Sequence, residues 1–192
     1  YQFTVENGQI VYGLGAVKGA GEAAIEAILA ERKANGSFND LFEFCRRVDL
    51  HKVNKRVLEA LVKSGAMDEL GPHRAAIFES LNKAVHAAEQ YLRNSAQGQS
   101  DLFGCVSESN SESDVNFYIS CSPWLDQDRL FAEKETLGVY FSGHPLEQYS
   151  DELDRLVTTK ISQLQPKQGQ SVIVAGLIVA VRPMMTKRGD KM

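Results

Sequence analysis

Two glycines separated by one small residue follow a lysine near the start of the chain, in the order Lys18, Gly19, Ala20, Gly21. Glycine adopts backbone conformations that other residues avoid, so this spacing permits a tight turn. A helix that begins directly after the turn has free amide groups and the positive end of its dipole there. Such an arrangement binds phosphate through the backbone, and the ammonium group of Lys18 adds a positive charge. These residues therefore predict a phosphate contact.

This turn resembles the hairpin of the helix-hairpin-helix motif, which holds the DNA backbone without reading bases. A plain turn at the entry of a helix explains the same pattern without a ligand. A third interpretation takes Gly13, Gly15 and Gly19 as the dinucleotide-binding loop of a small oxidoreductase. That loop needs a second strand and an acidic residue at its end, whereas the residues after Gly21 predict a helix.

A second turn of similar composition follows another predicted helix, with Lys63, Ser64 and Gly65 in sequence. It resembles a degenerate copy of the first, because Met67 stands where the second glycine would be. Two such hairpins resemble the tandem arrangement that straddles a duplex, although a purely structural turn explains Met67 better. The DNA-binding residues expected from both turns are Lys18, Gly19, Ala20, Gly21, Lys63, Ser64 and Gly65.

Residues 94–113 are mostly Ser, Asn, Gln, Gly and Glu. This composition buries too little apolar surface to offset the entropy of ordering, and it predicts an exposed linker. Within the linker, Leu102 and Phe103 are the only large apolar side chains between Arg93 and Cys105. Because no local core can receive them, burial in the pocket of a partner is the use that remains.

Residues 99–103 resemble the pentapeptide by which bacterial proteins attach to the ring-shaped sliding clamp. Gln99 stands at its first position, and Leu102 and Phe103 stand at its last two. The resemblance implies a clamp-binding site formed by Gln99, Ser100, Asp101, Leu102 and Phe103.

The residues before the linker predict a mostly helical unit that would position both turns. A β-hairpin is expected around Asn7 and Gly8, and four helices with recognisable ends follow it. The first helix is expected to begin near Glu22 and to end at Gly36, and the second to be capped by a residue within 37–40. The third is expected to begin at Asn54 and to end at Gly65, and Pro72 is expected in the first turn of the fourth. The core-facing stripe of that helix is expected to contain Ile77, Leu81, Val85, Ala88 and Leu92.

After the linker, a second helical stretch is predicted from Pro123 to about Leu156, with a break between Gly143 and Pro145. The unbroken apolar run 172–181 is rich in Val and Ile and predicts a buried strand. This strand would enter a basic turn at Lys187, Arg188 and Gly189. The acidic side chains expected on solvated helix faces include Glu133, Glu135, Asp151, Glu152 and Asp154.

Composition limits the possible functions. The chain has 192 residues, 43% of them hydrophobic, enough for the core of one or two domains. Its net charge of −4 disfavours an overall basic nucleic-acid binder, so a DNA contact must be local. The 3 cysteines include no close pair, which predicts neither disulfides nor a zinc site. No signal peptide or membrane-spanning run is found, which predicts a soluble cytoplasmic protein.

The string EKETLGVYFSGHPLEQY at 133–149 completes the set of motifs. Together they resemble the C-terminal half of the α subunit of bacterial DNA polymerase III, over essentially the whole chain. The resemblance implies a mainly α fold with a terminal β element. Its four parts would be the end of the fingers region with a tandem helix-hairpin-helix unit (1–93), a linker with the clamp-binding peptide (94–113), a helical connector (114–165) and the truncated first strands of an OB fold (166–192).

The same resemblance implies a fragment of a DNA-directed DNA polymerase, a nucleotidyltransferase of DNA replication, that has no catalytic site itself. The family's metal-binding aspartates and their magnesium belong to a palm domain that would precede Tyr1. No cofactor or metal is therefore expected in this chain. The implied partners are double-stranded DNA, the sliding clamp, other replicase subunits and, at the OB fold, single-stranded DNA, with no membrane.

Two other interpretations stay open. The helix-hairpin-helix region of a repair polymerase or ligase would share the turns but lack the peptide 99–103. Ser142 and His144 could be a nucleophile and its base, but no third group accompanies them. A capped turn before a helix explains them better.

Overall fold

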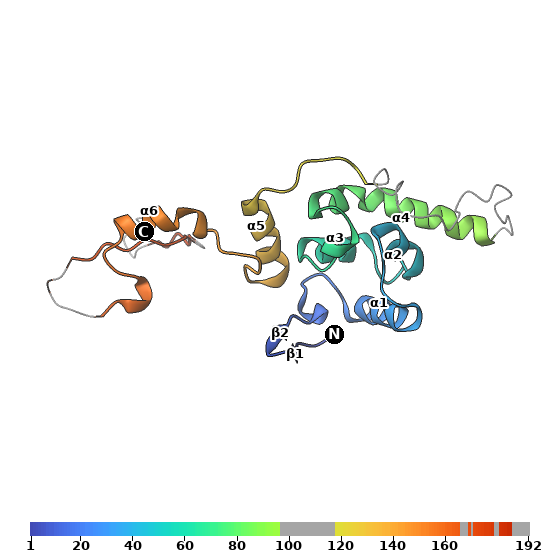
Figure 1. Cartoon of the computed structure of the whole chain (residues 1–192), viewed down its shortest axis with the longest axis horizontal. Coiled ribbons are helices and arrows are strands. Elements are labelled where there is room, and N and C mark those ends of the chain that lie inside the picture. Colours follow the sequence, from blue (N-terminus) through green and yellow to red (C-terminus); the bar gives the residue numbers. More distant parts are fainter. Residues whose placement is uncertain (97–117, 166–168, 170, 179–180, 186–192) are drawn as a thin grey trace. The chain divides into compact units, whose positions relative to one another are not determined.

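The computed structural model describes residues 1–96, 118–165, 169, 171–178 and 181–185. The chain falls into two units, Tyr1–Phe141 and Ser142–Met192, termed the N-terminal and the C-terminal unit. In the N-terminal unit, α1 to α4 gather around one core (Figure 1). Its described elements are β1 (Thr4–Glu6), β2 (Gln9–Val11), η1 (Leu14–Ala16), α1 (Glu22–Asn35), α2 (Leu41–Arg47), α3 (Lys55–Lys63), η2 (Asp68–Leu70), α4 (Arg74–Ala96) and α5 (Asp126–Leu137).

The chain begins with an antiparallel hairpin in which Val5 of β1 is paired with Ile10 of β2. Asn7 and Gly8 form its turn, with φ values of 52° and 78°. A type I′ turn requires positive φ at both positions, and Asn-Gly adopts these angles readily. The predicted hairpin is therefore confirmed.

Side-chain caps and a left-handed glycine set the ends of the first three helices. The Asp40 carboxylate accepts the amide hydrogen of Glu43 at 2.8 Å and starts α2. The Asn54 side chain accepts the amide hydrogen of Val57 at 3.2 Å and starts α3. Each cap satisfies an amide that has no partner within its helix. Gly36, with a φ of 80°, ends α1 as predicted.

The fourth helix departs from the prediction at both ends. It begins at Arg74, so Pro72 precedes the helix and does not lie in its first turn. His73 stands directly before the helix, and its Nδ1 accepts an amide hydrogen of the first turn at 3.2 Å. Ile77, Leu81 and Ala88 of the predicted stripe are buried and Val85 is partly buried, whereas Leu92 is 52% exposed. The core-facing surface of α4 therefore ends before its last turns.

One apolar core is shared by α1, α2, α3 and α4. Full burial of a large aliphatic or aromatic side chain contributes roughly 1.5 to 3 kcal/mol. The core includes Ile25 and Ile28 of α1, Leu41 and Phe44 of α2, Val57, Leu58 and Leu61 of α3, and Ile77 and Leu81 of α4.

The described chain returns to this core at Tyr118. The Tyr118 hydroxyl accepts the amide hydrogen of Leu41 at 3.1 Å and donates to the carbonyl oxygen of Leu70. Directly after it, the amide of Ile119 donates to the hydroxyl of Ser80 at 2.8 Å. The described residues on both sides of 97–117 therefore belong to the same unit.

The break in the second helical stretch is wider than predicted. Helix α5 ends at Leu137, and Gly138 follows with a left-handed φ of 79°. Helical structure returns only at Glu147. The described helices of the C-terminal unit are η4 (Glu147–Tyr149), α6 (Ser150–Leu156) and η5 (Ile161–Gln163).

The buried strand predicted over 172–181 is not formed in the described residues. No strand is assigned to 171–178, and the side chains of Val172 and Ile173 are 44% and 59% exposed. The backbone of Ile173 hydrogen-bonds Thr158: its carbonyl oxygen accepts from the Thr158 amide at 3.0 Å and from the Thr158 hydroxyl at 3.4 Å, and its amide donates to that hydroxyl at 2.9 Å. A strand needs neighbours along its length to be buried, and in the described part of this unit the hydrogen bonds of 171–178 reach only Thr158. An OB fold here stays a prediction.

Changing Tyr118 to Phe should test how firmly the chain is held where it returns to the core. Loss of the hydroxyl leaves the Leu41 amide and the Leu70 carbonyl without this partner, and an unpaired buried group costs about 1 to 3 kcal/mol. We expect the free energy of unfolding to fall by about that amount in urea denaturation. Tyr91→Phe is the matched control, because Tyr91 is 55% exposed on α4. Equal stability of the Tyr118 and Tyr91 variants would contradict the role of the hydroxyl.

Candidate nucleic-acid interface

The first predicted turn, residues 18–21, connects η1 to α1 and is termed hairpin one. Gly19 has a φ of 95°, a left-handed value that favours glycine. A Cβ at this position would lie 3.4 Å from the Cβ of Ala60, so hairpin one packs on α3. Ala20 is only 9% exposed and anchors the turn in the core. Gly21 is the N-terminal cap of α1 and contributes no side-chain hydrogen bond.

Amide groups at the start of α1 are open. Within the described residues, no group accepts the amide hydrogens of Glu22 and Ala23. The next amide, that of Ala24, donates to the carbonyl oxygen of Gly21 at 3.1 Å. The Glu22 carboxylate belongs to the same turn, but it is exposed and free to point into solvent. The open amides and the dipole of a 14-residue helix can receive a phosphate oxygen.

Lys18 contributes to this site through its side chain alone. Its backbone amide donates to the carbonyl oxygen of Thr136 at 2.8 Å and is therefore used within the protein. Its ammonium lies near Gly138, where an added Cβ would be 3.6 Å from the Nζ atom. In the described part of the chain, this ammonium has no ion-pair partner. It is available to an anion.

The second predicted turn, residues 63–67, is termed hairpin two, and its polar groups contact other parts of the protein. The Lys63 ammonium lies 2.8 Å from the Glu135 carboxylate. The Ser64 hydroxyl is buried and donates to a carbonyl oxygen of α3 at 2.9 Å. Gly65 has a φ of 81°, and the Arg74 guanidinium lies against it. This geometry favours the structural interpretation of hairpin two.

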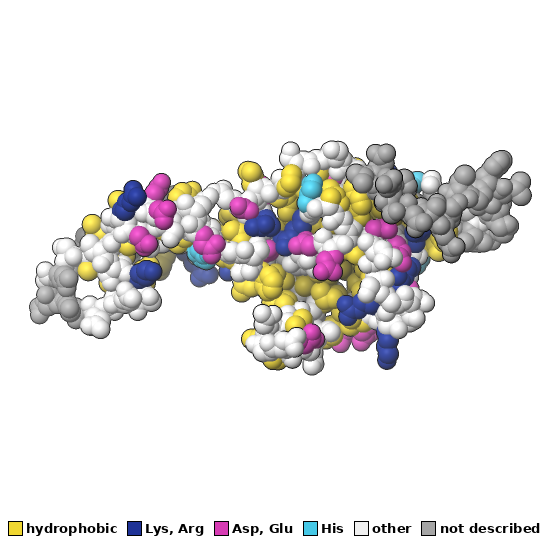
Figure 2. All heavy atoms as spheres, viewed as in Figure 1, with side chains coloured by type: hydrophobic (Ala, Val, Ile, Leu, Met, Phe, Trp, Pro, Cys, Tyr) yellow, Lys and Arg dark blue, Asp and Glu magenta, His cyan; other side chains and the backbone are white. Residues whose placement is uncertain are grey.

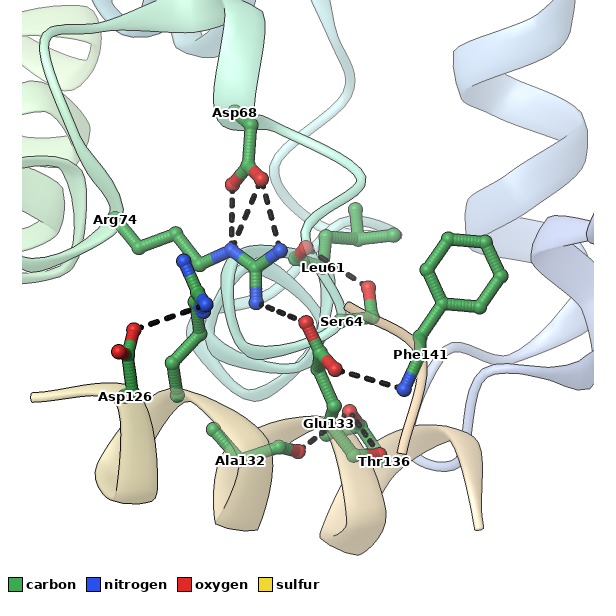
Figure 3. A network of polar contacts seen from close by, with 10 residues as sticks. Leu61, Ser64, Asp68, Arg74, Asp126, Ala132, Glu133, Thr136 and Phe141 are labelled. Atoms are coloured by element: carbon green, nitrogen blue, oxygen red, sulfur yellow. Dashed lines mark hydrogen bonds and ion pairs between the residues drawn. The ribbon is translucent and has the colours of Figure 1, made fainter. Parts of the chain in front are cut away.

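Behind hairpin two, a buried ion pair joins α4 to α5 (Figure 3). Arg74 Nη1 donates to Glu133 Oε1 at 2.9 Å, and Arg74 Nε donates to Asp68 Oδ1 at 2.7 Å. The other oxygen of Glu133 accepts the amide hydrogen of Phe141 at 2.8 Å. Burial alone lowers the pKa of the Arg74 guanidinium, but hydrogen bonds to Asp68 and Glu133 outweigh it and raise the pKa above its ordinary value.

Glu133 corrects the prediction that it lies on a solvated helix face, because its side chain is 0% exposed. It follows Leu130 by three positions and precedes Leu137 by four, and both leucines are buried. This spacing places it on the apolar face of α5, a signal that the sequence contains. Its partner Arg74 lies 59 residues earlier, and no local pattern indicates that pairing.

Ser142 and His144 lie in the C-terminal unit at a turn before η4. His144 Nδ1 accepts the amide hydrogen of Leu146 at 3.2 Å, and its carbonyl oxygen accepts that of Glu147 at 2.9 Å. These bonds form the capped turn that the sequence favours. Among the described residues, no group of three or more His, Cys, Asp or Glu side chains could hold a metal ion. No helix in the described ranges is long and apolar enough to cross a membrane.

The predicted clamp-binding peptide, residues 99–103, lies outside the described residues. The structure locates the chain on either side of it, at the end of α4 and at Tyr118.

Residues 1–77 match the family model described as a helix-hairpin-helix motif. The matched range contains hairpin one, hairpin two and the start of α4. The site therefore belongs to the helix-hairpin-helix class.

Over its full length the chain is also similar to DNA polymerase III α subunits. It is 48% identical to that of Vibrio cholerae over 193 residues and 47% identical to that of Escherichia coli K12 over 194 residues. It is 43% identical to that of Pseudomonas aeruginosa over 211 residues. Each match covers 100% of this chain but only 17% or 18% of the relative. The chain belongs to the DNA polymerase III α-subunit family and corresponds to one segment of it.

Changing Glu133 to Ala should destabilise the N-terminal unit strongly, because it leaves the buried Arg74 charge without one of its carboxylates. Removing one partner of a fully buried ion pair costs about 3 to 5 kcal/mol. The loss here should lie below that range, because Arg74 is 12% exposed and keeps its hydrogen bonds to Asp68. Glu135→Ala is the matched control on the same helix. The Glu135 side chain is 66% exposed, so its loss should cost about 1 kcal/mol or less. Urea denaturation measures both, and similar losses in the two variants would show that the Arg74–Glu133 pair has no special weight.

Proposed function

We propose that this chain holds the backbone of duplex DNA at hairpin one, as a non-catalytic part of a replicative DNA polymerase. The observation that carries the proposal is the open start of α1, where the amides of Glu22 and Ala23 lie close in sequence to the Lys18 ammonium. Backbone amides and one ammonium recognise phosphate and carry no information about the bases. Binding should therefore be independent of DNA sequence.

The charge distribution supports a local contact. The chain has a net charge of −4. On the face of the N-terminal unit drawn in Figure 2, Lys and Arg side chains are interspersed with Asp and Glu side chains. Because most of DNA affinity comes from neutralised phosphates, such a surface should bind weakly at physiological salt. Hairpin one would position a duplex that other parts of the polymerase also hold.

The relatives are named for DNA polymerase III, and we propose by homology that the parent protein is a DNA-directed DNA polymerase of bacterial DNA replication in the cytoplasm. Its phosphoryl transfer needs carboxylates that hold metal ions, which would belong to another part of the parent. Other replicase subunits would be partners, and residues 166–192 would begin an OB fold that binds single-stranded DNA. A repair polymerase or ligase is the weaker alternative, because the relatives match the chain far beyond its hairpins.

A second part of the proposal is attachment to the sliding clamp through Gln99, Leu102 and Phe103. Their support is the resemblance of residues 99–103 to a clamp-binding pentapeptide, and the polar composition around two adjacent large apolar residues. Both neighbouring described segments belong to the N-terminal unit. A clamp bound here would therefore be tethered to the unit that contains hairpin one.

Lys18→Glu should weaken duplex binding equally on unrelated sequences, because it places a negative charge beside the phosphate. Each phosphate contact contributes a slope of about −0.9 in log K against log salt, and this slope should become shallower. Lys33→Glu near the other end of α1 is the matched control for the change in net charge. Fluorescence anisotropy with a short labelled duplex at low salt measures both. Equal binding by the two variants would remove hairpin one from the DNA interface.

Changing both Leu102 and Phe103 to Ala should abolish clamp binding. Burial of each side chain contributes roughly 1.5 to 3 kcal/mol, so the pair should contribute on the order of 3 kcal/mol or more, over a hundredfold in affinity. Calorimetric titration of a bacterial clamp with a peptide spanning 96–106 measures this, with the double-alanine peptide beside it. The same substitutions in the full chain should leave its thermal unfolding unchanged. The clamp proposal is contradicted if both peptides bind equally, or if neither peptide binds at high micromolar concentration.

A further inference from the structure

A hollow of about 270 Å³ lies beside hairpin one, between α3 and α5, and we infer that it is a phosphate-binding pocket completed by α5. Its charged lining residues are Lys18, Arg56, Lys63, Glu59 and Glu135. The inference rests on the proposed DNA contact, since the phosphate would belong to the same backbone. It adds Arg56 to the cations of the site and gives Lys63 a ligand-binding role through its side chain.

Two of the three cations in this pocket are free to meet an anion. Within the described residues, neither Lys18 nor Arg56 has an ion-pair partner. The Glu59 carboxylate lies 3.8 Å from the ammonium of Lys55, a residue that does not line the pocket. The pocket therefore contains more available positive than negative charge.

Two hydrogen bonds to backbone carbonyls hold the walls of the pocket together before any ligand arrives. The Lys18 amide donates to the Thr136 carbonyl oxygen at 2.8 Å, and the Tyr12 hydroxyl donates to the Leu137 carbonyl oxygen at 3.0 Å. These two carbonyls end α5, where the helix dipole is negative and would repel a phosphate. The carbonyl oxygens of Thr136 and Leu137 accept hydrogen bonds from Lys18 and Tyr12, and these bonds reduce the repulsion. Without them, the end of α5 would expose both carbonyl groups to the phosphate.

The third cation, Lys63, is held by Glu135 at 2.8 Å. The Glu135 side chain is 66% exposed, so it can leave the pair at little cost and enter solvent. A phosphate in the pocket would take its place beside Lys63. Glu135 thus competes with the phosphate in the free protein and lowers the affinity for DNA.

The test uses the full chain, a short labelled duplex and fluorescence anisotropy at several salt concentrations. Arg56→Ala should weaken binding and make the salt slope shallower by about 0.9, the value of one phosphate contact. Lys52→Ala removes the same charge from an exposed side chain outside the pocket lining, and should change both quantities less. Thermal unfolding of each variant confirms that it is folded.

Glu135→Gln should strengthen binding about fivefold, the effect of one unit charge a few ångströms from another in water. Glu89→Gln is the control, because Glu89 is a half-exposed residue of α4 in an exposed pair with Arg93. Its substitution changes the net charge equally at a position outside the pocket lining.

The outcomes separate the pocket from the proposed function. If Arg56→Ala matches Lys52→Ala, or Glu135→Gln matches Glu89→Gln, while Lys18→Glu still weakens binding, hairpin one binds DNA without a phosphate in this pocket. If Lys18→Glu and Arg56→Ala both leave duplex binding unchanged, the proposed DNA contact fails together with the pocket.

Discussion

The pair of Arg74 and Glu133 joins segments that lie 59 residues apart, and among the described contacts of α5 it is the one in which a charge is fully buried. Moving two charges out of water is unfavourable, and their attraction offsets this only when their remaining polar atoms also have partners. Here Asp68 binds the guanidinium and the Phe141 amide binds the second carboxylate oxygen. With α5 held in this position, the carbonyl oxygen of Thr136 accepts the Lys18 amide hydrogen of hairpin one. The proposed interface therefore depends on an ion pair that lies outside it.

Most of the N-terminal unit could be predicted from its sequence, because its helix ends are set by residues close to them. Asp40 and Asn54 cap amides three residues ahead, and Gly36 adopts the left-handed angle that ends a helix. The Asn7–Gly8 turn is equally local. Hairpin one belongs to the same category, since its glycines and the start of α1 are adjacent in the chain. For these elements, the residues that determine the helix ends and turns lie within a few positions of them, so the sequence alone is sufficient to predict them.

The rest of the site depends on which helix packs against which, and local patterns do not contain that information. Glu135 converts Lys63 from a free cation into one half of an ion pair, although the two residues lie 72 positions apart. Arg56 lines a pocket because Glu135 and Thr136 of α5 form the opposite wall. The prediction of a buried strand over 172–181 was wrong for the described residues for a related reason. The apolar pattern shows that the run prefers a strand, but burial of a strand depends on neighbouring strands, and none is assigned beside 171–178.

The end of α4 at Ala96 places a geometric limit on attachment to a clamp. Only two residues stand between Ala96 and Gln99 in the sequence, and a chain advances at most about 3.6 Å per residue, so a clamp that binds Gln99 would be held within roughly 11 Å of the helix end. The connection between α4 and the proposed clamp-binding peptide is therefore short in sequence. A clamp bound to this peptide would stay close to the C-terminal end of the 23-residue helix α4. The direction of α4 would then determine on which side of the polymerase the clamp lies.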